Sequence, residues 1–249
     1  MLRPKKVGAL PTGKDSDEVK QTNEIKFAPI LLDDIVIKNK DITSDALHTQ
    51  VKFADYLVEE RKAHYYFCVK GNQATLLADI EYHFEQQLKQ PDYEDEVSIA
   101  HGRIEIRRIW TTTALNQYLK FPHTEQVYNT REKLLIKKVA KKFIEIAYGI
   151  TSRTPKEACP KTILHKVRGH WSIEICHYII DWIYDEDRST IRMGFGPENM
   201  TRLRRFAIGL VKSKSVKSVS KKMRELNWNT RAVLDYLKIT TNRKMAYRA

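Results

Sequence analysis

The sequence has few cysteines and no long hydrophobic run. Its cysteines are Cys68, Cys159 and Cys176, without a CxxC pair. An odd number in this arrangement argues against a disulfide framework and fits a reducing compartment. No apolar run approaches the roughly 20 residues of a membrane span, and the first residues lack the apolar core of a secretion signal. The sequence therefore predicts a soluble protein of the cytoplasm with no membrane partner.

Acidic residues are scarce in the last fifth of the chain. Residues 198–249 hold 14 lysines and arginines against three acids, a net +11 of the formal +13 that all 249 residues carry. Such a surface implies an anionic partner, and nucleic acid is the commonest one for a soluble protein. An anionic membrane is the alternative, because Met200, Leu203, Phe206 and Leu210 would share one apolar side of a helix.

Apolar periodicity and turn residues predict alternating strands and helices, and a hydrophobic content of 42% is enough for a packed core. Residues 1–21 resemble a polar tail, and a short helix is expected to begin near Asn23, with Thr22 or Asn23 as its N-cap. A weak strand is expected to end at Asp45, with further strands at 64–71, 101–114, 125–138 and 141–152, and helices at 51–62 and 74–88.

The chain becomes helical again after Pro155, and one helix expected over Val167–Arg192 has a charged side. At 100° per residue this side gathers three acids and two arginines: Glu174, Asp181, Asp185, Arg188 and Arg192. It is either a solvated face with pairs such as Asp185 with Arg188, or a face that binds a cation. A break at 194–197 and a basic stretch at 212–222 follow, with helical sequence around them.

Five sequence blocks follow one another in a specific order. They are DALHTQ (45–50), YYFCVKGNQATL (65–76), HGRIEIR (101–107), YGITSRTP (148–155) and RGHWSIE with DWIYDED (168–187). In these blocks the chain resembles the H-repeat-associated proteins and their insertion-sequence relatives, which are transposases of the DDE type. KGNQ or HGR alone is a weak signal, whereas five blocks in order are specific. The resemblance runs from about residue 22 to residue 239.

The resemblance implies a ribonuclease H-like α/β fold with a β-rich insertion before the last catalytic acid. It divides the chain into the tail (1–21), the N-terminal part of the core (22–96), the insertion (97–151), the region of the Glu helix (152–197) and a basic helical region (198–249). Members cleave and join DNA with two Mg²⁺ or Mn²⁺ ions about 4 Å apart, held by carboxylates. Asp45 resembles the family's second acid and Glu174 its last. We therefore expect the two carboxylates to bind metal and to lie within about 8 Å of each other.

Residues around the last acid have supporting roles in the resemblance. They are Arg168, His170 and Trp171. Arginine suits bidentate phosphate binding, and the tryptophan either stacks in the site or packs in the core. Two positions depart from the family pattern, since Ile175 stands where Asn is common and His177 precedes Tyr178 rather than Trp. The histidines near Cys176 match no established zinc spacing.

Double-stranded DNA at transposon ends is the partner that the resemblance implies. A homodimer is compatible with this role, and the bacterial nucleoid is the expected location. Candidate phosphate contacts in the basic region are Arg202, Arg205, Lys212, Lys214 and Lys217. Arg103 and Arg107 share one face of their predicted strand and either meet DNA phosphates or pair with acids on a neighbouring strand.

One catalytic residue of the family has no counterpart in the sequence. Members place their first Asp in an Asp-Gly-Lys strand some tens of residues before the segment around Asn23, and Asp15 and Asp17 have no predicted strand around them. We therefore expect a shortened copy that by itself neither cuts nor joins DNA. The alternative is a DNA-binding remnant or accessory protein without cleavage. Divalent-metal binding at Asp45 and Glu174 would distinguish the two.

Overall fold

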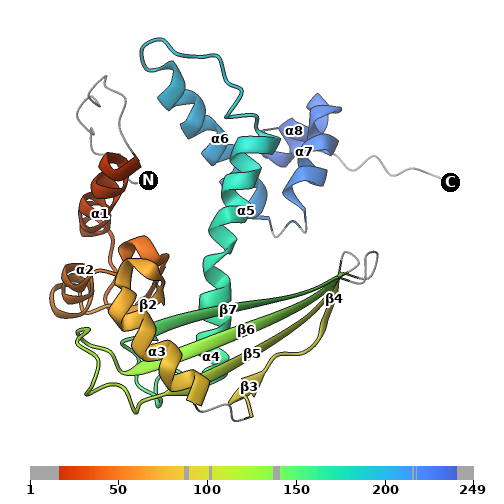
Figure 1. The fold of residues 1–249 in the computed structure, drawn as a ribbon. Helices are drawn as coiled ribbons and strands as arrows, with labels where there is room; N and C mark the ends of the chain where they lie inside the picture. The colour runs from red at the N-terminus through yellow and green to blue at the C-terminus, as the bar shows by residue number, and fades with distance from the viewer. Residues whose placement is uncertain are drawn as a thin grey trace. The chain divides into compact units, whose positions relative to one another are not determined.

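The computed structural model of the chain describes residues 17–86, 90–100, 103–136, 141–214, 216 and 218–239. The chain divides into two compact units, and the boundary lies between His170 and Trp171. The first, here called the sheet unit, is a β-sheet covered by helices. The second, here called the helical unit, consists of helices in its described part (Figure 1).

The sheet unit alternates helices and strands in its first half and is mostly strands in its second. Its helices are α1 (Asp17–Asp33), the 3-10 turn η1 (Ala46–His48), α2 (Val51–Asp55), the π-helical turn η2 (Tyr56–Glu60) that continues α2, the 3-10 turn η3 (Gly71–Gln73), α3 (Ala74–Gln86) and α4 (Pro160–His170). Its strands are β1 (Asp41–Ser44), β2 (His64–Val69), β3 (Tyr93–Glu94), β4 (Ser98–Ala100), β5 (Arg103–Thr112), β6 (Gln126–Ile136) and β7 (Lys141–Thr151). The five strands expected from the sequence, and the helices that become α2 with η2 and α3, are confirmed.

The described strands form a single sheet in the order β1-β2-β7-β6-β5-β3, with β4 also paired to β5. β1 and β2 are parallel, and the other pairs are antiparallel. β7 pairs with β2 from Tyr66 to Val69, so the strands of residues 97–151 extend the same sheet that contains β1. β1 lies at one edge of this sheet, and Asp45 follows it directly.

The two faces of β2 bury different helices because its side chains alternate between the faces. Tyr65, Phe67 and Val69 pack in a core with residues of α2, η2 and α3. Tyr66 points to the other face and packs with Ile163 and the rest of the buried side of α4. The sheet therefore has helices on both faces, with α3 and α4 on opposite sides (Figure 1). The expected mixed α/β class is confirmed.

The helical unit contains α5 (Ser172–Tyr178), the π-helical turn η5 (Ile179–Ile183), α6 (Gly196–Lys212), α7 (Val219–Asn227) and α8 (Thr230–Tyr236). Its buried core among the described residues is small: Ile179, Ile208, Val211 and Val219. Side chains cap the last two helices, since Ser218 accepts a hydrogen bond from the Lys221 amide and Asn229 accepts one from the Ala232 amide. The expected helical character of the C-terminal region is confirmed.

The first helix begins earlier than the sequence indicated. α1 starts at Asp17, so residues 17–21 of the expected polar tail are helical and neither Thr22 nor Asn23 is its N-cap. The residues before Asp17 lie outside the described part of the chain.

The prediction of a helix over Val167–Arg192 is wrong for its second half. The helix ends with η5 at Ile183, and Asp185 has a φ of 53°, a left-handed backbone conformation that cannot continue a right-handed helix. Asp185 and Arg188 still form the expected ion pair, with 3.6 Å between Oδ1 and Nε. The apolar side is only partly buried, since Ile179 is 6% exposed but Trp182 is 65% exposed.

Candidate functional site at the carboxyl end of β1

Asp45 lies at the carboxyl end of two neighbouring parallel strands. β1 and β2 are in register from Asp41 with His64 to Ser44 with Phe67, so both strands end at the same edge of the sheet. Open α/β sheets bind ligands in this position. The Asp45 side chain is exposed and makes no capping hydrogen bond to η1, although Asp45 directly precedes that turn. Its carboxylate is therefore not occupied by the cap.

Three side chains fix the backbone that follows Asp45. The hydroxyl of the fully buried Thr49 donates to the Cys68 carbonyl at 2.6 Å. The Asn72 amide donates to the Ala46 carbonyl at 2.5 Å, and the Gln73 amide donates to the Thr49 carbonyl at 2.8 Å. η1 is thus held against the end of β2 and against η3.

The sequence analysis treated KGNQ only as part of a family block and as the end of a strand. It did not predict that Thr49, Asn72 and Gln73 hold the backbone after Asp45 by hydrogen bonds. A signal was present, because side-chain amides directly after a buried strand suit backbone carbonyls of a neighbouring turn. The pairing partner of each amide, however, depends on the register of β1 with β2, which the sequence does not state.

The thiol beside Asp45 is held in its neutral form. Burial raises the pKa of Cys68, Lys70 opposes this increase, and the negative charges of Asp45 and Glu145 add to it. A protonated thiol is a poor metal ligand and a poor nucleophile. At this edge of the sheet the Asp45 carboxylate is therefore a better candidate metal ligand than the thiol.

The last turn of α4 lies beside β1. Asp41, at the start of β1, is 3.0 Å from Lys166 Nζ and 2.9 Å from the guanidinium of Arg153. His170 Nδ1 is 3.3 Å from the hydroxyl of Thr43, which is two residues before Asp45. Burial would raise the pKa of Asp41, but Lys166 and Arg153 outweigh it and lower the pKa. The predicted supporting residue His170 therefore lies near the carboxyl end of β1.

The other arginines near this region are paired with acids. Arg168 Nη2 is 3.8 Å from Glu105, and Glu105 also pairs with Arg107. Arg107 is 5% exposed and lies 3.0 Å from Glu132, whose pKa is raised by burial in spite of this arginine. Arg107 therefore follows the second of the two alternatives: it pairs with acids on its own strand and the neighbouring strand, and it is too buried to contact a DNA phosphate.

Arg107 is buried because its side of the sheet is covered. Alternation places it on the face of Ile109, which packs against α4. Arg103, at the start of the same strand, is exposed.

Glu174 belongs to the helical unit. It lies in the first turn of α5 with an exposed side chain, and Trp171, directly before this helix, is 49% exposed. Asp45 belongs to the sheet unit. Because the two units are described separately, the expected approach of the Asp45 and Glu174 carboxylates stays a prediction.

The predicted DNA-binding cations of the basic region differ in their contacts. Arg202 pairs with Glu198 at 2.6 Å, and Lys212 Nζ lies 2.8 Å from Cys176 Sγ. Lys214 stacks over the ring of Tyr236 at 3.6 Å. Arg205 is exposed. Lys217 lies outside the described residues.

The apolar side of α6 on which the membrane alternative depends is separate from the buried side and is partly exposed, so this alternative stays open. Ile208 and Val211 are buried, whereas Leu203 is 60% exposed and Phe206 is 58% exposed. Among the helices of the described chain, none has the length and apolar character to cross a membrane.

Comparison with known proteins identifies the family. The family described as "Transposase DDE domain" matches residues 10–208. "Putative transposase YncI" of Escherichia coli O157:H7 is 30% identical over 84% of this chain and 56% of its own length. "H repeat-associated putative transposase YhhI" of E. coli K12 is 27% identical over 79% of this chain and 53% of its own length. The chain thus spans about half the length of the curated relatives it matches.

Among solved structures, a piggyBac transposase synaptic complex with hairpin DNA covers 96% of this chain and 45% of that chain, with 15% identity and a TM-score of 0.34. This likeness is too weak to assign a fold. The family match extends over most of the chain and includes the strand before Asp45 and the helix that carries Glu174. The chain therefore belongs to the DDE transposase domain family.

Proposed function

We propose that the chain takes part in metal-dependent cleavage and transfer of DNA strands at the ends of an insertion sequence, with Asp45 and Glu174 as metal-binding carboxylates. The observation that carries this proposal is the place of Asp45. The chain belongs to the transposase family, and its exposed Asp45 carboxylate lies where the parallel strands β1 and β2 both end, without capping the turn that follows. The β1–β2 pair with helices on both faces is also compatible with a ribonuclease H-like fold, which we include in the proposal.

The donor set fits a hard divalent cation. Mg²⁺ and Mn²⁺ prefer carboxylate and water oxygens, and the neighbouring Cys68 is a neutral thiol rather than a competing thiolate. Asp45 and Glu174 would hold the metal, and bound metal would activate a water or a DNA 3′-OH and stabilise the leaving oxygen. Hydrogen bonds of Thr49, Asn72 and Gln73 hold the backbone that directly follows Asp45.

The proposed pairing of Asp45 with Glu174 is compatible with chain connectivity. His170 is hydrogen-bonded near the end of β1, and Glu174 follows it by four residues. Four extended residues span at most about 14 Å, so the Glu174 Cα cannot be farther than that from the His170 Cα. An approach of the carboxylates within about 8 Å is compatible with this limit.

A second candidate is a DNA-binding accessory protein without cleavage. The observation that favours it is the net +11 of residues 198–249, which would bind duplex DNA whether or not a metal site is complete. The partner in both cases is double-stranded DNA, and the two candidates differ in whether metal binding at Asp45 has a catalytic result.

Metal binding tests whether the two acids form one site. Mn²⁺ affinity is measured by electron paramagnetic resonance for the full chain, Asp45→Asn, Glu174→Gln and the double variant. If one ion is shared, each single change weakens binding and the loss in the double variant differs from the sum of the two single losses, because contacting groups are not additive. Asp79→Asn and Glu225→Gln are matched controls in the sheet and helical units. Additive losses from Asp45→Asn and Glu174→Gln would reject the shared site.

Cleavage separates the two candidate functions. The full chain is incubated with supercoiled plasmid and Mg²⁺ or Mn²⁺ beside the same variants. Nicking that both Asp45→Asn and Glu174→Gln abolish supports the enzyme. Such nicking would also overturn the expectation that this chain by itself does not cut DNA. Without nicking, duplex binding that Mn²⁺ strengthens only when Asp45 and Glu174 are both present supports an incomplete enzyme, whereas duplex binding unchanged by either substitution supports the accessory protein.

A further inference from the structure

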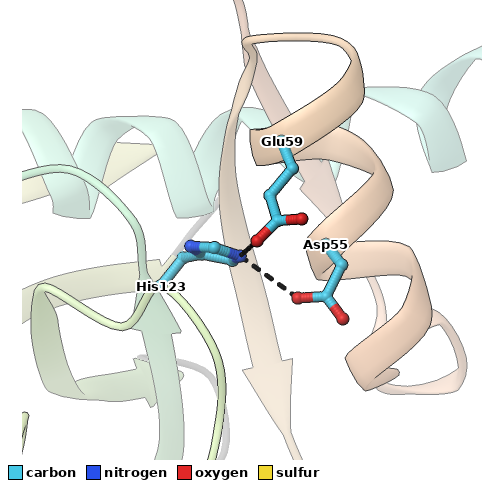
Figure 2. A group of neighbouring side chains, drawn as sticks. All are labelled: Asp55, Glu59 and His123. Atoms are coloured by element: carbon cyan, nitrogen blue, oxygen red, sulfur yellow. Dashed lines mark hydrogen bonds and ion pairs between the residues drawn. The ribbon is translucent and has the colours of Figure 1, made fainter.

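We propose that Asp55, Glu59 and His123 form a binding site for a divalent transition-metal ion, with Zn²⁺ as the ion that this donor set fits best. The three ligand atoms lie within 4.8 Å of one another, and none of the three residues belongs to β1 or to the turn η1 after it. Figure 2 shows the two carboxylates on one helix and the imidazole directed toward both. The inference goes beyond the proposed function and does not depend on it.

The two distances from the imidazole nitrogen to the carboxylates are close to those around a tetrahedral ion. His123 Nε2 lies 3.1 Å from Asp55 Oδ1 and 3.4 Å from Glu59 Oε1. Ligands about 2.1 Å from a tetrahedral Zn²⁺ are about 3.4 Å from one another. One imidazole nitrogen with two carboxylate oxygens favours Zn²⁺, Co²⁺ or Mn²⁺ over Mg²⁺, which prefers oxygen alone. With three protein ligands, a fourth position remains for water.

The imidazole is held in place before any ion arrives. The residues on both sides of His123 are bound to one buried side chain, because the Tyr65 hydroxyl donates to the Pro122 carbonyl at 2.7 Å and lies 3.2 Å from the Thr124 hydroxyl. His123 itself has a φ of 58°, an uncommon conformation for a residue with a side chain. Such conformations persist where surrounding contacts fix them, and they cluster at binding sites.

Without an ion, the two neighbouring carboxylates destabilise the helix that carries them. Asp55 and Glu59 are four residues apart where α2 passes into the π-helical turn η2, so they lie on the same side of the helix. Like charges at this spacing destabilise a helix. A neutral imidazole has one N–H and can donate from Nε2 to only one of the two carboxylates. A divalent cation among the three groups satisfies all of them, and it would clip the loop that contains His123 to α2.

The experiment titrates the full chain with Zn²⁺ by calorimetry and with Co²⁺ by its visible absorption. His123→Asn is the main variant because asparagine tolerates a left-handed backbone and the fold is retained. We expect it to weaken Zn²⁺ binding at least about tenfold and to remove the Co²⁺ absorption of the bound ion. Glu59→Gln, at a side chain that is 65% exposed, gives the same result without touching the loop.

Two controls separate this site from other ion binding. His165→Asn removes a histidine that is 3.5 Å from one carboxylate, Asp95, and should leave Zn²⁺ binding unchanged. Asp45→Asn should also leave it unchanged, so a failure of the proposed catalytic site does not affect the outcome. Zn²⁺ should raise the melting temperature of the unchanged chain but not of His123→Asn. Zn²⁺ affinity that survives both His123→Asn and Glu59→Gln, or that falls equally in His165→Asn, would overturn the proposal and leave a simple ion pair.

Discussion

The sheet unit and the helical unit differ in where they place their aromatic side chains. In the sheet unit Tyr65, Phe67 and Tyr128 are at most 2% exposed. In the helical unit Trp182 is 65% exposed and Trp228 is 90% exposed, while the buried residues among those described are four aliphatic ones. The sheet unit thus has a core that specifies its own fold, whereas the helical unit keeps large apolar and cationic groups on its surface. Such a surface is suited to a partner.

The largest effect is expected from a methyl group added inside the sheet unit. Gly149 in β7 faces Tyr128 in β6, and a Cβ at this position would overlap the Tyr128 ring and lie 2.5 Å from the Phe67 carbonyl oxygen. Gly149→Ala should therefore lower the free energy of unfolding of the sheet unit by about 3 kcal/mol or more. Urea denaturation followed by circular dichroism measures this change.

The control is the same substitution in the helical unit. A Cβ at Gly209 in α6 meets nothing within 4 Å, so Gly209→Ala should stabilise the helix by about 0.5–1 kcal/mol. Equal losses in the two variants would mean that the packing of β7 against Tyr128 is not as tight as described.

The next effect concerns the small core of the helical unit. Ile208 is 7% exposed and Leu203, on the same helix, is 60% exposed. Ile208→Ala should cost about 2 kcal/mol, because removing buried methylenes from a four-residue core leaves few neighbours to fill the space. Leu203→Ala should cost less than about 0.5 kcal/mol. Hydrogen exchange of the α6 amides measures both, and faster exchange in Leu203→Ala than in Ile208→Ala would reverse the assignment of the buried side.

A smaller effect is expected from Asp41, which joins β1 to α4. Its pKa is lower in the folded state than the ordinary 3.8, because Lys166 and Arg153 outweigh the effect of burial. The stabilisation is therefore present above the unfolded pKa and is lost as the pH falls through the folded one. Asp41→Asn should lower the free energy of unfolding by about 1–2 kcal/mol at pH 7, and the difference should shrink below about pH 4.

An exposed ion pair in the helical unit serves as the control for Asp41. Glu198 and Arg202 in α6 have half-exposed side chains, so Glu198→Gln should cost less than about 0.5 kcal/mol at any pH. A pH-independent difference between Asp41→Asn and the unchanged chain would show that the ion pairs of Asp41 are not what stabilises this contact.

The strand before Asp45 and the aromatic strand HYYFCV could be predicted because their signals are local. The aromatic and β-branched content of HYYFCV, followed by turn residues, specifies a strand without reference to distant parts of the chain, and the short segment before Asp45 gives a weaker signal of the same kind. The place of Asp45 after β1 followed from this. The family blocks then supplied the role of the acid, which no periodicity could give.

Arg107 and His123 could not be placed in the same way. The alternation of Ile104 and Ile106 indicated that Arg107 lies on the outer face, but this sheet is covered on both faces, so the arginine is buried and paired with acids. His123 meets Asp55 across 68 residues, and its left-handed backbone follows from hydrogen bonds to Tyr65 rather than from its neighbours in sequence. Both features depend on tertiary contacts.

The smallest effect is expected from single cations on the surface of the helical unit. Arg205 is exposed on α6, whereas the neighbouring Arg204 has a 12% exposed side chain near Glu186, at 3.9 Å. If α6 binds duplex DNA, Arg205→Gln should reduce the slope of the logarithm of the binding constant against the logarithm of the salt concentration by about one. Arg204→Gln carries the same change in charge and should leave the slope nearly unchanged, because its guanidinium does not reach phosphates. Fluorescence anisotropy with a labelled duplex at several salt concentrations gives both slopes.

Arg103→Gln tests the sheet unit in the same assay. If Arg103→Gln changes the slope more than Arg205→Gln does, the DNA contact lies at β5 rather than in the helical unit.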